Sequence, residues 1–467
     1  MSSIVGNIGL SIVTFISKLI SGGVVYILLA RIMNLDDYGL LTFGNSLCGL
    51  IAVIAEFGFS LMAQKDIPQS RFPLNQYVYN AIIQKIVFST IAFTGGALYL
   101  SYFFDNSNVV IGSIFLLNAI ATSMSMYFLA VLRAKNVFRS ESISSVSYFI
   151  VILFVVGSYF WLRYSILYLA WGLFSARIVQ LLLLILIYKR RFGLFEFKFS
   201  KTIQSYLFKN SFSFGLHYII GIFYFTIDTQ LIAYYYGNGS LAVYQTFLNI
   251  IMMMLMVGDL LTNVFLPYLS KIYIVNRSSL VKISTVINDA IFSIGILMFV
   301  FVNVFSKELL NFLYSSKYDA AFIIAFPLSI VLLCRILSSI YAILLTVSEH
   351  QNVRMFIVFI TLIVNLTLNL YVIPIYGILG AAYVSLVTHL SLILLYAVFV
   401  YRFFKSFLFS GKVFFWLSST ILIFTVNSFF KYQLSMTFSL CLLIIWIFSI
   451  IILYRKNRFK ELWNIIK

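Results

Sequence analysis

Residues 355–400 read MFIVFITLIVNLTLNLYVIPIYGILGAAYVSLVTHLSLILLYAVFV and contain no lysine, arginine, aspartate or glutamate. An α-helix needs about 20 apolar residues to cross the hydrocarbon core of a bilayer, so this stretch is long enough for two crossings. Pro374 and Gly377 lie near its middle, where a proline and a glycine allow the chain to turn. The stretch therefore predicts two transmembrane helices, near residues 354–373 and 376–400, joined by a short connection.

The rest of the chain has the same character. Of its 467 residues, 62% are hydrophobic and only 10% are charged, and the mean hydropathy is +1.03. A soluble domain carries about 25% charged residues. The composition therefore excludes an ordinary soluble protein and predicts an all-α polytopic membrane protein.

Fourteen stretches long enough to cross a membrane recur along the chain. They lie near residues 11–33, 39–63, 80–104, 109–132, 143–162, 165–188, 211–236, 241–268, 284–305, 321–347, 354–373, 376–400, 411–430 and 435–454. Their grouping predicts two six-helix lobes, at 1–190 and 211–403, separated by a cytoplasmic linker at 191–210. Helices 13 and 14 and a basic cytoplasmic tail are predicted within 404–467.

The lysines and arginines alternate between the two sides of this topology. Segments after even-numbered spans, together with the C-terminal tail, hold 23 of the 32, whereas segments after odd-numbered spans hold five. Positive residues favour the cytoplasmic side of a membrane, so both termini are predicted to be cytoplasmic. The net charge of +18 is thus spread over short loops and not gathered on a soluble face, which argues against nucleic-acid binding.

The sequence contains no motif for nucleotide or metal binding. The patterns G-x-x-x-x-G-K-[ST], H-E-x-x-H and C-x-x-C are absent, and the three cysteines lie far apart within apolar stretches. No segment between the predicted spans is long enough to form a soluble catalytic domain. The sequence therefore predicts a transporter that has no catalytic residue, metal or cofactor, and not an enzyme.

Ionisable residues inside the predicted spans are the candidate functional residues, because such groups are costly in a bilayer and usually face a protein interior or a hydrated cavity. Lys18 and Glu56 lie at similar depth on consecutive spans, which predicts an ion pair. Such a pair either fixes helix packing or lines a cavity and breaks during transport. Arg177 and Arg335 lie too deep to reach the interface easily. Because a guanidinium suits phosphate or carboxylate, each arginine either contacts an anionic substrate or pairs with an intramembrane carboxylate.

Three further residues have other expected roles. Asp228 and Asp259 are the acidic candidates for binding a proton or Na⁺ if transport is driven by an ion. Lys85 lies little more than one turn from the cytoplasmic end of its span. Its ammonium group is therefore expected to extend to the membrane interface.

The two halves of the chain show weak similarity to each other. Residues 30–39 and 236–244 occupy matching places, and each precedes a span that contains an asparagine and a carboxylate. Six spans per half would give two copies of the same orientation, related by a parallel repeat, with the substrate path between them. A chance likeness between apolar helices is the alternative.

Two regions of the sequence resemble a known family. The first comprises LAR at 29–31, DYG at 37–39, EFGF at 56–59 and AQKDI at 63–67, and the second comprises NLTLNL at 365–370 followed by IPIYGILGAA at 373–382. Through spans one to twelve the chain resembles the bacterial polysaccharide-unit flippases. These are the O-antigen and capsule transporters of the multidrug/oligosaccharidyl-lipid/polysaccharide exporter superfamily.

The resemblance implies a flippase of the bacterial inner membrane that moves an oligosaccharide linked to undecaprenyl pyrophosphate by alternating access. The implied pathway is the synthesis of a surface polysaccharide such as capsule or the O antigen of lipopolysaccharide. The implied partners are the lipid-linked oligosaccharide, membrane lipids and other assembly proteins of that pathway. Lys18, Glu56, Arg177 and Arg335 are then candidate substrate-binding residues. Two alternatives stay open: a multidrug or lipid-precursor exporter of the same superfamily, and an integral-membrane polysaccharide polymerase or acyltransferase.

Overall fold

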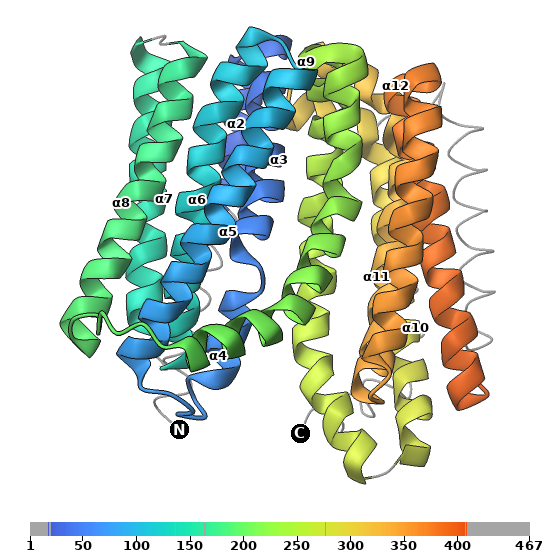
Figure 1. Ribbon diagram of the computed structural model, residues 1–467. Coiled ribbons are helices and arrows are strands. Elements are labelled where there is room, and N and C mark those ends of the chain that lie inside the picture. Colours follow the sequence, from blue (N-terminus) through green and yellow to red (C-terminus); the bar gives the residue numbers. More distant parts are fainter. Residues whose placement is uncertain are drawn as a thin grey trace, which may run out of the picture. The chain divides into compact units, whose positions relative to one another are not determined.

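The computed structural model describes residues 17, 20–135, 137–162, 165–275, 277–406 and 408. Within these ranges the chain is almost entirely helical and contains no strand. Nine of the described helices are long and apolar enough to cross a membrane (Figure 1). The predicted class, an all-α polytopic membrane protein, is therefore confirmed. Predicted helices 13 and 14, the basic tail and the start of the first span (residues 11–16, 18 and 19) lie outside the described residues.

The helices follow one another with short connections. In chain order they are η1 (Ile20–Val24), α2 (Val25–Ile32), α3 (Leu35–Glu56), α4 (Phe59–Asp66), α5 (Leu74–Phe103), α6 (Asn106–Ala134), α7 (Phe138–Leu162), α8 (Ile166–Phe192), α9 (Lys201–Val275), α10 (Arg277–Leu313), η2 (Ser316–Ile324), α11 (Ala325–Val347) and α12 (Gln351–Phe404).

Two of these helices each contain a sharp turn at a glycine. Gly237 in α9 has φ 77°, and Gly377 in α12 has φ 58°. A glycine adopts such angles readily because it has no Cβ atom. On both sides of each glycine the helix continues for more than the roughly 20 residues that a crossing needs. Each of α9 and α12 thus contains two consecutive predicted spans, and the turn expected after Pro374 is present.

The predicted second span, 39–63, is interrupted. Helix α3 ends at Glu56, and the chain turns through left-handed backbone at Phe57 (φ 42°) and Gly58 (φ 81°) before α4 begins. The Glu56 carboxylate accepts a hydrogen bond from the backbone N–H of Ser60, at 2.5 Å. Because the first N–H groups of a helix have no partner within the helix, this contact stabilises the start of α4. The interruption places a carboxylate at a buried corner between two helices.

Contacts divide the chain into two compact units. The first comprises Met1–Thr246, Leu313–Tyr318 and Leu362–Ala381, and the second comprises Phe247–Phe312, Asp319–Thr361 and Ala382–Lys467. The first unit joins the helices of the predicted first lobe to the first part of α9. The predicted lobe boundary at 191–210 stays a prediction.

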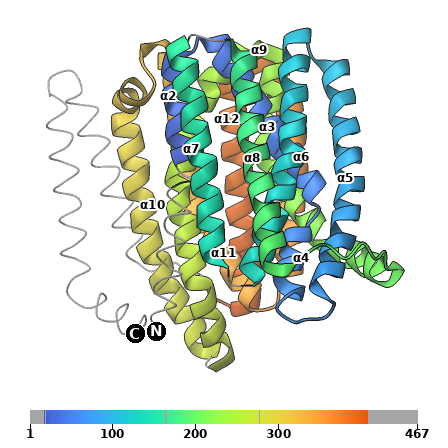
Figure 2. The ribbon, with the colours of Figure 1, turned by 90° about the vertical axis from the view of Figure 1, so that its left-hand side faces the viewer.

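In the first unit the long helices pack side by side. Helix α6 contacts α3, α5 and α8, and α8 also contacts α7, so that α7, α8, α6 and α5 form a row (Figure 2). Large side chains such as Tyr127 and Tyr188 are fully buried in its core. On the outside, Trp161 is 85% exposed and Phe154 is 74% exposed. Apolar side chains directed outward in this way suit contact with lipid.

The second unit has its own apolar core. Its buried members come from α10 and α11: Phe292, Ile296, Val300, Phe305 and Leu337. A polar contact also joins these two helices, because the Asn303 side chain donates a hydrogen bond to the Ser329 hydroxyl, at 2.7 Å. The two helices are therefore held together by apolar packing and by a partly buried hydrogen bond.

The side chain of Asn80, on α5, makes four of the hydrogen bonds around the connection between α8 and α9. The Asn80 side chain donates hydrogen bonds to the carbonyls of Gln76 and Lys198, at 2.8 and 3.0 Å. Its oxygen accepts hydrogen bonds from the backbone N–H of Ser200 and from the Gln204 side chain, at 3.0 and 3.1 Å. The connection is thereby held against the first unit.

At the opposite end of the first unit, two helix corners meet. The Cβ atom of an alanine at position 39 would lie 1.7 Å from the backbone oxygen of Asn238, so only glycine allows this approach. The side chains of Asn238 and Asn108 exchange two hydrogen bonds, of 2.8 and 3.3 Å. Residues 39 and 238 belong to the two segments that the sequence suggested as repeats.

A lysine completes the contacts at that end. The Lys317 ammonium group donates a hydrogen bond to the backbone oxygen of Arg31, at 3.1 Å, and another to that of Met33. These oxygens lie at the end of α2, where backbone carbonyls have no partner within the helix. The contact therefore attaches the segment that follows α10 to α2.

Candidate functional site

A cavity of about 480 Å³ lies inside the first unit. Its wall is formed by α3, α6, α7 and α8, together with the η1 and α2 segment. The polar side chains in this wall are those of Tyr26, Asn45, Asn118, Thr122, Ser145, Tyr148, Arg177 and Gln180. Since α3, α6, α7 and α8 are all long enough to span a membrane, the cavity lies within the transmembrane region and offers hydrogen-bonding groups there.

Arg177 is the charged residue of this cavity. Its guanidinium group lies 4.0 Å from the centre of the Tyr148 ring and donates a hydrogen bond to the Tyr148 hydroxyl, at 2.9 Å. A second hydrogen bond goes to the Gln180 side chain, at 2.7 Å. A guanidinium group has five N–H donors. These contacts hold its plane in place, and within the described part of the chain its Nε donor is buried without a partner.

The charge of the cavity wall favours an anion. Among the described residues of the wall, Arg177 is the one charged side chain, and no carboxylate is present. A buried positive charge is costly unless an opposite charge or hydrogen-bond acceptors compensate it. Arginine in particular suits phosphate and carboxylate groups, because its planar fork can donate two parallel hydrogen bonds. The cavity can therefore bind a small anionic group.

A second, smaller cavity lies next to the first. It has a volume of about 230 Å³, and its wall includes Glu56 and Arg133. Met126 and Leu129 of α6 belong to the walls of both cavities. The two cavities are therefore separated by these apolar side chains of a single helix.

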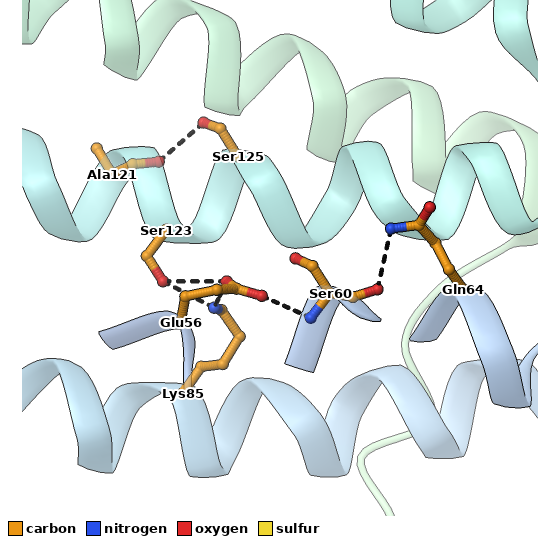
Figure 3. A network of polar contacts seen from close by, with 7 residues as sticks. All are labelled: Glu56, Ser60, Gln64, Lys85, Ala121, Ser123 and Ser125. Atoms are coloured by element: carbon orange, nitrogen blue, oxygen red, sulfur yellow. Dashed lines mark hydrogen bonds and ion pairs between the residues drawn. The ribbon is translucent and has the colours of Figure 1, made fainter. Parts of the chain in front are cut away.

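Glu56 forms a buried ion pair with Lys85 (Figure 3). Lys85 is 0% exposed and Glu56 is 1% exposed. The Lys85 ammonium group also donates a hydrogen bond to the Ser123 hydroxyl, at 2.7 Å, and lies 5.6 Å from the centre of the Tyr127 ring. The expectation that Lys85 extends to the membrane interface is wrong, because the nearby carboxylate holds its ammonium group inside the bundle. The predicted partner of Glu56, Lys18, lies outside the described residues.

A second ion pair lies where α6 meets α7. Arg133 donates hydrogen bonds from two of its nitrogens to the two carboxylate oxygens of Glu141, one of them at 2.9 Å. Glu141 is buried, whereas Arg133 is partly exposed. Bidentate pairs of this kind have a fixed geometry, so this contact orders the connection between the two helices.

The remaining predicted residues lie elsewhere. The Asp228 carboxylate, on α9 in the first unit, accepts hydrogen bonds from the Tyr244 hydroxyl and from the Thr229 backbone, the latter at 2.8 Å. Arg335, on α11 in the second unit, is half-buried and contacts the Met252 sulfur, at 3.4 Å. The Asp259 side chain lies outside the described part. Among the described residues, no group of three His, Cys, Asp or Glu side chains could hold a metal ion.

Three contributors to the site were not identified from the sequence. Lys85 could have been paired with Glu56, because both residues lie at similar depth on consecutive predicted spans. Tyr148 and Asn118 gave no such signal. Tyrosine is frequent in this chain, with 31 copies, and the angular position of a helix within a bundle determines which residues face a cavity.

The family model described as "Polysaccharide biosynthesis protein" matches residues 5–273. A curated protein of Haloferax volcanii, "Probable low-salt glycan biosynthesis flippase Agl15", is 23% identical over 391 residues, which cover 80% of this chain and 79% of that protein.

Two solved structures have a similar fold. A lipid II flippase MurJ in an inward closed conformation has a TM-score of 0.75 at 16% identity, covering 96% of this chain and 99% of that one. An inward-facing multidrug resistance MATE family transporter has a TM-score of 0.67 at 12% identity, covering 83% and 96%. The fold is thus shared with transporters of more than one kind, and the family match over more than half of the sequence shows that the chain belongs to the polysaccharide biosynthesis protein family.

Proposed function

We propose that this protein is a flippase for a lipid-linked oligosaccharide, and not an enzyme. Its cargo is a repeat unit of the O-antigen or capsule type, carried on undecaprenyl pyrophosphate. The protein moves this unit from the cytoplasmic to the outer leaflet of a bacterial inner membrane, with both of its own termini in the cytoplasm. Family membership, a relative named as a probable glycan flippase and a fold shared with a lipid II flippase support the proposal.

The observation that carries the proposal is the arginine in the transmembrane cavity. A diphosphate linked to a lipid has to cross a region where an uncompensated charge is strongly disfavoured. Arg177 supplies a compensating positive charge there, with its guanidinium plane held by Tyr148 and Gln180. The neutral hydrogen-bonding groups of the wall suit sugar hydroxyls. A cavity of about 480 Å³ accommodates part of such a headgroup, and the lipid tail stays in the bilayer.

The same cavity weighs against the multidrug alternative. A site for cationic drugs would gain affinity from a carboxylate, but the described wall contains none. A lipid-precursor exporter of the same superfamily is the second candidate, because its cargo also carries a diphosphate. The identity of the glycan that accumulates when the protein is inactive distinguishes these two functions.

Transport is proposed to proceed by alternating access. In this scheme Lys18, Glu56 and Arg335 contribute to substrate binding together with Arg177. Asp228 and Asp259 are proposed as the groups that couple transport to an ion. Other surface-polysaccharide assembly proteins are proposed as partners.

The test uses cells that lack their own flippase and express this protein. Arg177→Ala should block surface glycan display and cause the lipid-linked oligosaccharide to accumulate on the cytoplasmic side. Arg177→Lys keeps the charge but loses the planar fork, and should retain part of the activity. Arg190→Ala, at the exposed end of the same helix, is the matched control and should behave as the wild type. Normal display with Arg177→Ala, at equal protein level, would exclude this cavity as the substrate site.

A further inference from the structure

Residues 193–212 comprise the connection that follows α8 and the first turns of α9. They expose aromatic and basic side chains together. The exposed apolar residues are Leu194, Phe197, Phe199, Phe208 and Phe212, and Phe197 is 80% exposed. Lys198, Lys201 and Lys209 are also exposed, and Glu196 is the one carboxylate of the segment. Figure 2 shows the start of α9 (green) projecting beside the lower end of α5.

The opposite face of the segment is fixed to the first unit. Ile203 and Leu207 are buried, and the Gln84 side chain donates a hydrogen bond to the Gln204 carbonyl, at 2.6 Å. Asn80 binds the same turn of α9 through the hydrogen bonds described above. The backbone of the segment is therefore held in place, with its lysines and phenylalanines on the exposed face.

A shallow hollow lies between two of the lysines. It has a volume of about 610 Å³, and its wall consists of Lys201, Thr202, Ser205, Tyr206, Lys209 and Asn210. Two ammonium groups and neighbouring hydroxyls are the donors that a phosphate group needs. The wall residue Tyr206 donates a hydrogen bond to the Asp66 carboxylate, at 3.1 Å, and this carboxylate also accepts a hydrogen bond from Tyr77, at 3.1 Å.

The aromatic side chains continue the lipid-facing surface of α5. Phe208 stacks on Phe88, with ring centres 6.4 Å apart and planes at 22°. Next to Phe88, the side chains of Ile86, Val87 and Ile91 are exposed. Phe208 thus extends an apolar surface suited to acyl chains, and the exposed Lys209 follows it in the sequence.

We propose that this face of residues 193–212 binds the phosphate headgroups of anionic phospholipids in the adjacent leaflet. A segment with aromatic residues beside lysines lies in the plane of the membrane interface, where apolar burial and attraction to anionic headgroups act together. The basic end of the first unit is also the end that the distribution of lysine and arginine assigns to the cytoplasm. This site is independent of the cargo that the protein moves.

The test is a lipid titration of the full-length protein in a neutral detergent. Phosphatidylglycerol and phosphatidylcholine with the same acyl chains are added, and the lipids that stay bound are counted by native mass spectrometry. The variants are Lys201→Gln with Lys209→Gln, and Lys201→Arg with Lys209→Arg. The matched control is Lys282→Gln with Lys405→Gln, which removes two exposed lysines elsewhere.

The wild type should retain phosphatidylglycerol in preference to phosphatidylcholine. Each lysine near an anionic headgroup contributes about a fivefold factor in affinity, so the double glutamine variant should bind phosphatidylglycerol about 30-fold more weakly. The double arginine variant and the control should bind as the wild type. Equal retention by the glutamine variant, equal retention of both lipids, or competition by inorganic phosphate alone would overturn the proposal.

Discussion

The buried ion pair between Glu56 and Lys85 allows a sharp test of how the first unit is stabilised. Both side chains are almost completely buried, so removal of either one leaves a charge in a region of low polarity. Breaking a buried pair in this way typically destabilises a protein by about 3–5 kcal/mol, whereas replacement of both partners is often neutral. Lys85→Met and Glu56→Gln are the single changes, and the double variant combines them.

In each single variant the remaining charged group keeps some of its other contacts. In Lys85→Met the Glu56 carboxylate keeps the backbone N–H of Ser60, at 2.5 Å, and the Ser123 hydroxyl, at 3.4 Å. In Glu56→Gln the Lys85 ammonium group keeps the Ser123 hydroxyl and lies over the Phe59 ring, at 5.8 Å. The remaining contacts reduce each loss, so we expect about 3 kcal/mol for each single change, at the lower end of the usual range.

The double variant should be within about 1 kcal/mol of the wild type, because the glutamine can still accept the Ser60 hydrogen bond and no buried charge is left. The assay is denaturant unfolding of the purified protein in mild detergent, followed by the loss of helical circular dichroism. Lys282→Met, at an exposed position, is the control and should change the unfolding free energy little. A loss below about 1 kcal/mol for Lys85→Met would refute the reasoning, since a Glu56 carboxylate that is stable in this place without Lys85 does not depend on that partner.

Surface glycan display of the same variants separates packing from transport. If the pair serves only to hold α3 and α5 together, display should follow stability, and the double variant should regain it. A stable double variant without display would assign the pair a direct part in transport. Exchange of the two residues is less informative, because the Ser60 N–H would then face an ammonium group.

Three further predictions concern contacts of the first unit. Gly39→Ala should lower the unfolding midpoint and the amount of folded protein, because its Cβ atom would lie 1.7 Å from the Asn238 oxygen; unchanged thermal stability would contradict that contact. Arg133→Met leaves the buried Glu141 carboxylate without its bidentate partner; because the Arg133 side chain is 37% exposed, the change should cost about 1–2 kcal/mol in denaturant unfolding, and the addition of Glu141→Gln should recover most of that loss. Lys317→Met should cost about 1–2 kcal/mol, because the carbonyls at the end of α2 lose a charged donor, and hydrogen exchange should rise at α2 and not at α8.

The transmembrane helices and their turns could be predicted from the sequence, because hydropathy and chain length alone require them. The apolar stretch at 355–400 is long enough to cross the membrane twice, and the chain turns at Gly377, the glycine near its middle. The corner after Glu56 was not predicted, since the residues around it are as apolar as those of a continuous span. Its cause is the left-handed backbone at Phe57 and Gly58, which local hydropathy does not report.

For the candidate site, the sequence predicted which charged residues lie in the interior but not which residues they contact. Because a charged side chain is disfavoured in the hydrocarbon core, Arg177 and Glu56 could be assigned to the protein interior without knowledge of their partners. Their partners depend on the rotation and depth of neighbouring helices, which packing determines. Depth alone could have matched Lys85 to Glu56, but the Lys85 side chain was expected to extend in the opposite direction. The Tyr148 ring beneath Arg177 could not be distinguished from other tyrosines of the chain.

Asn80 carries one consequence for the motion of the protein. Two amide hydrogens and two lone pairs are all that an asparagine side chain offers, and here each is used. Even an aspartate of equal size would turn two attractions into repulsions. Because Asn80 has no unused donor or acceptor, the connection between α8 and α9 cannot shift along α5 by a small distance without losing hydrogen bonds. Since Leu207 is also buried in the first unit, we expect any swing of the later part of α9 to pivot beyond Leu207, with residues 193–207 moving together with α5.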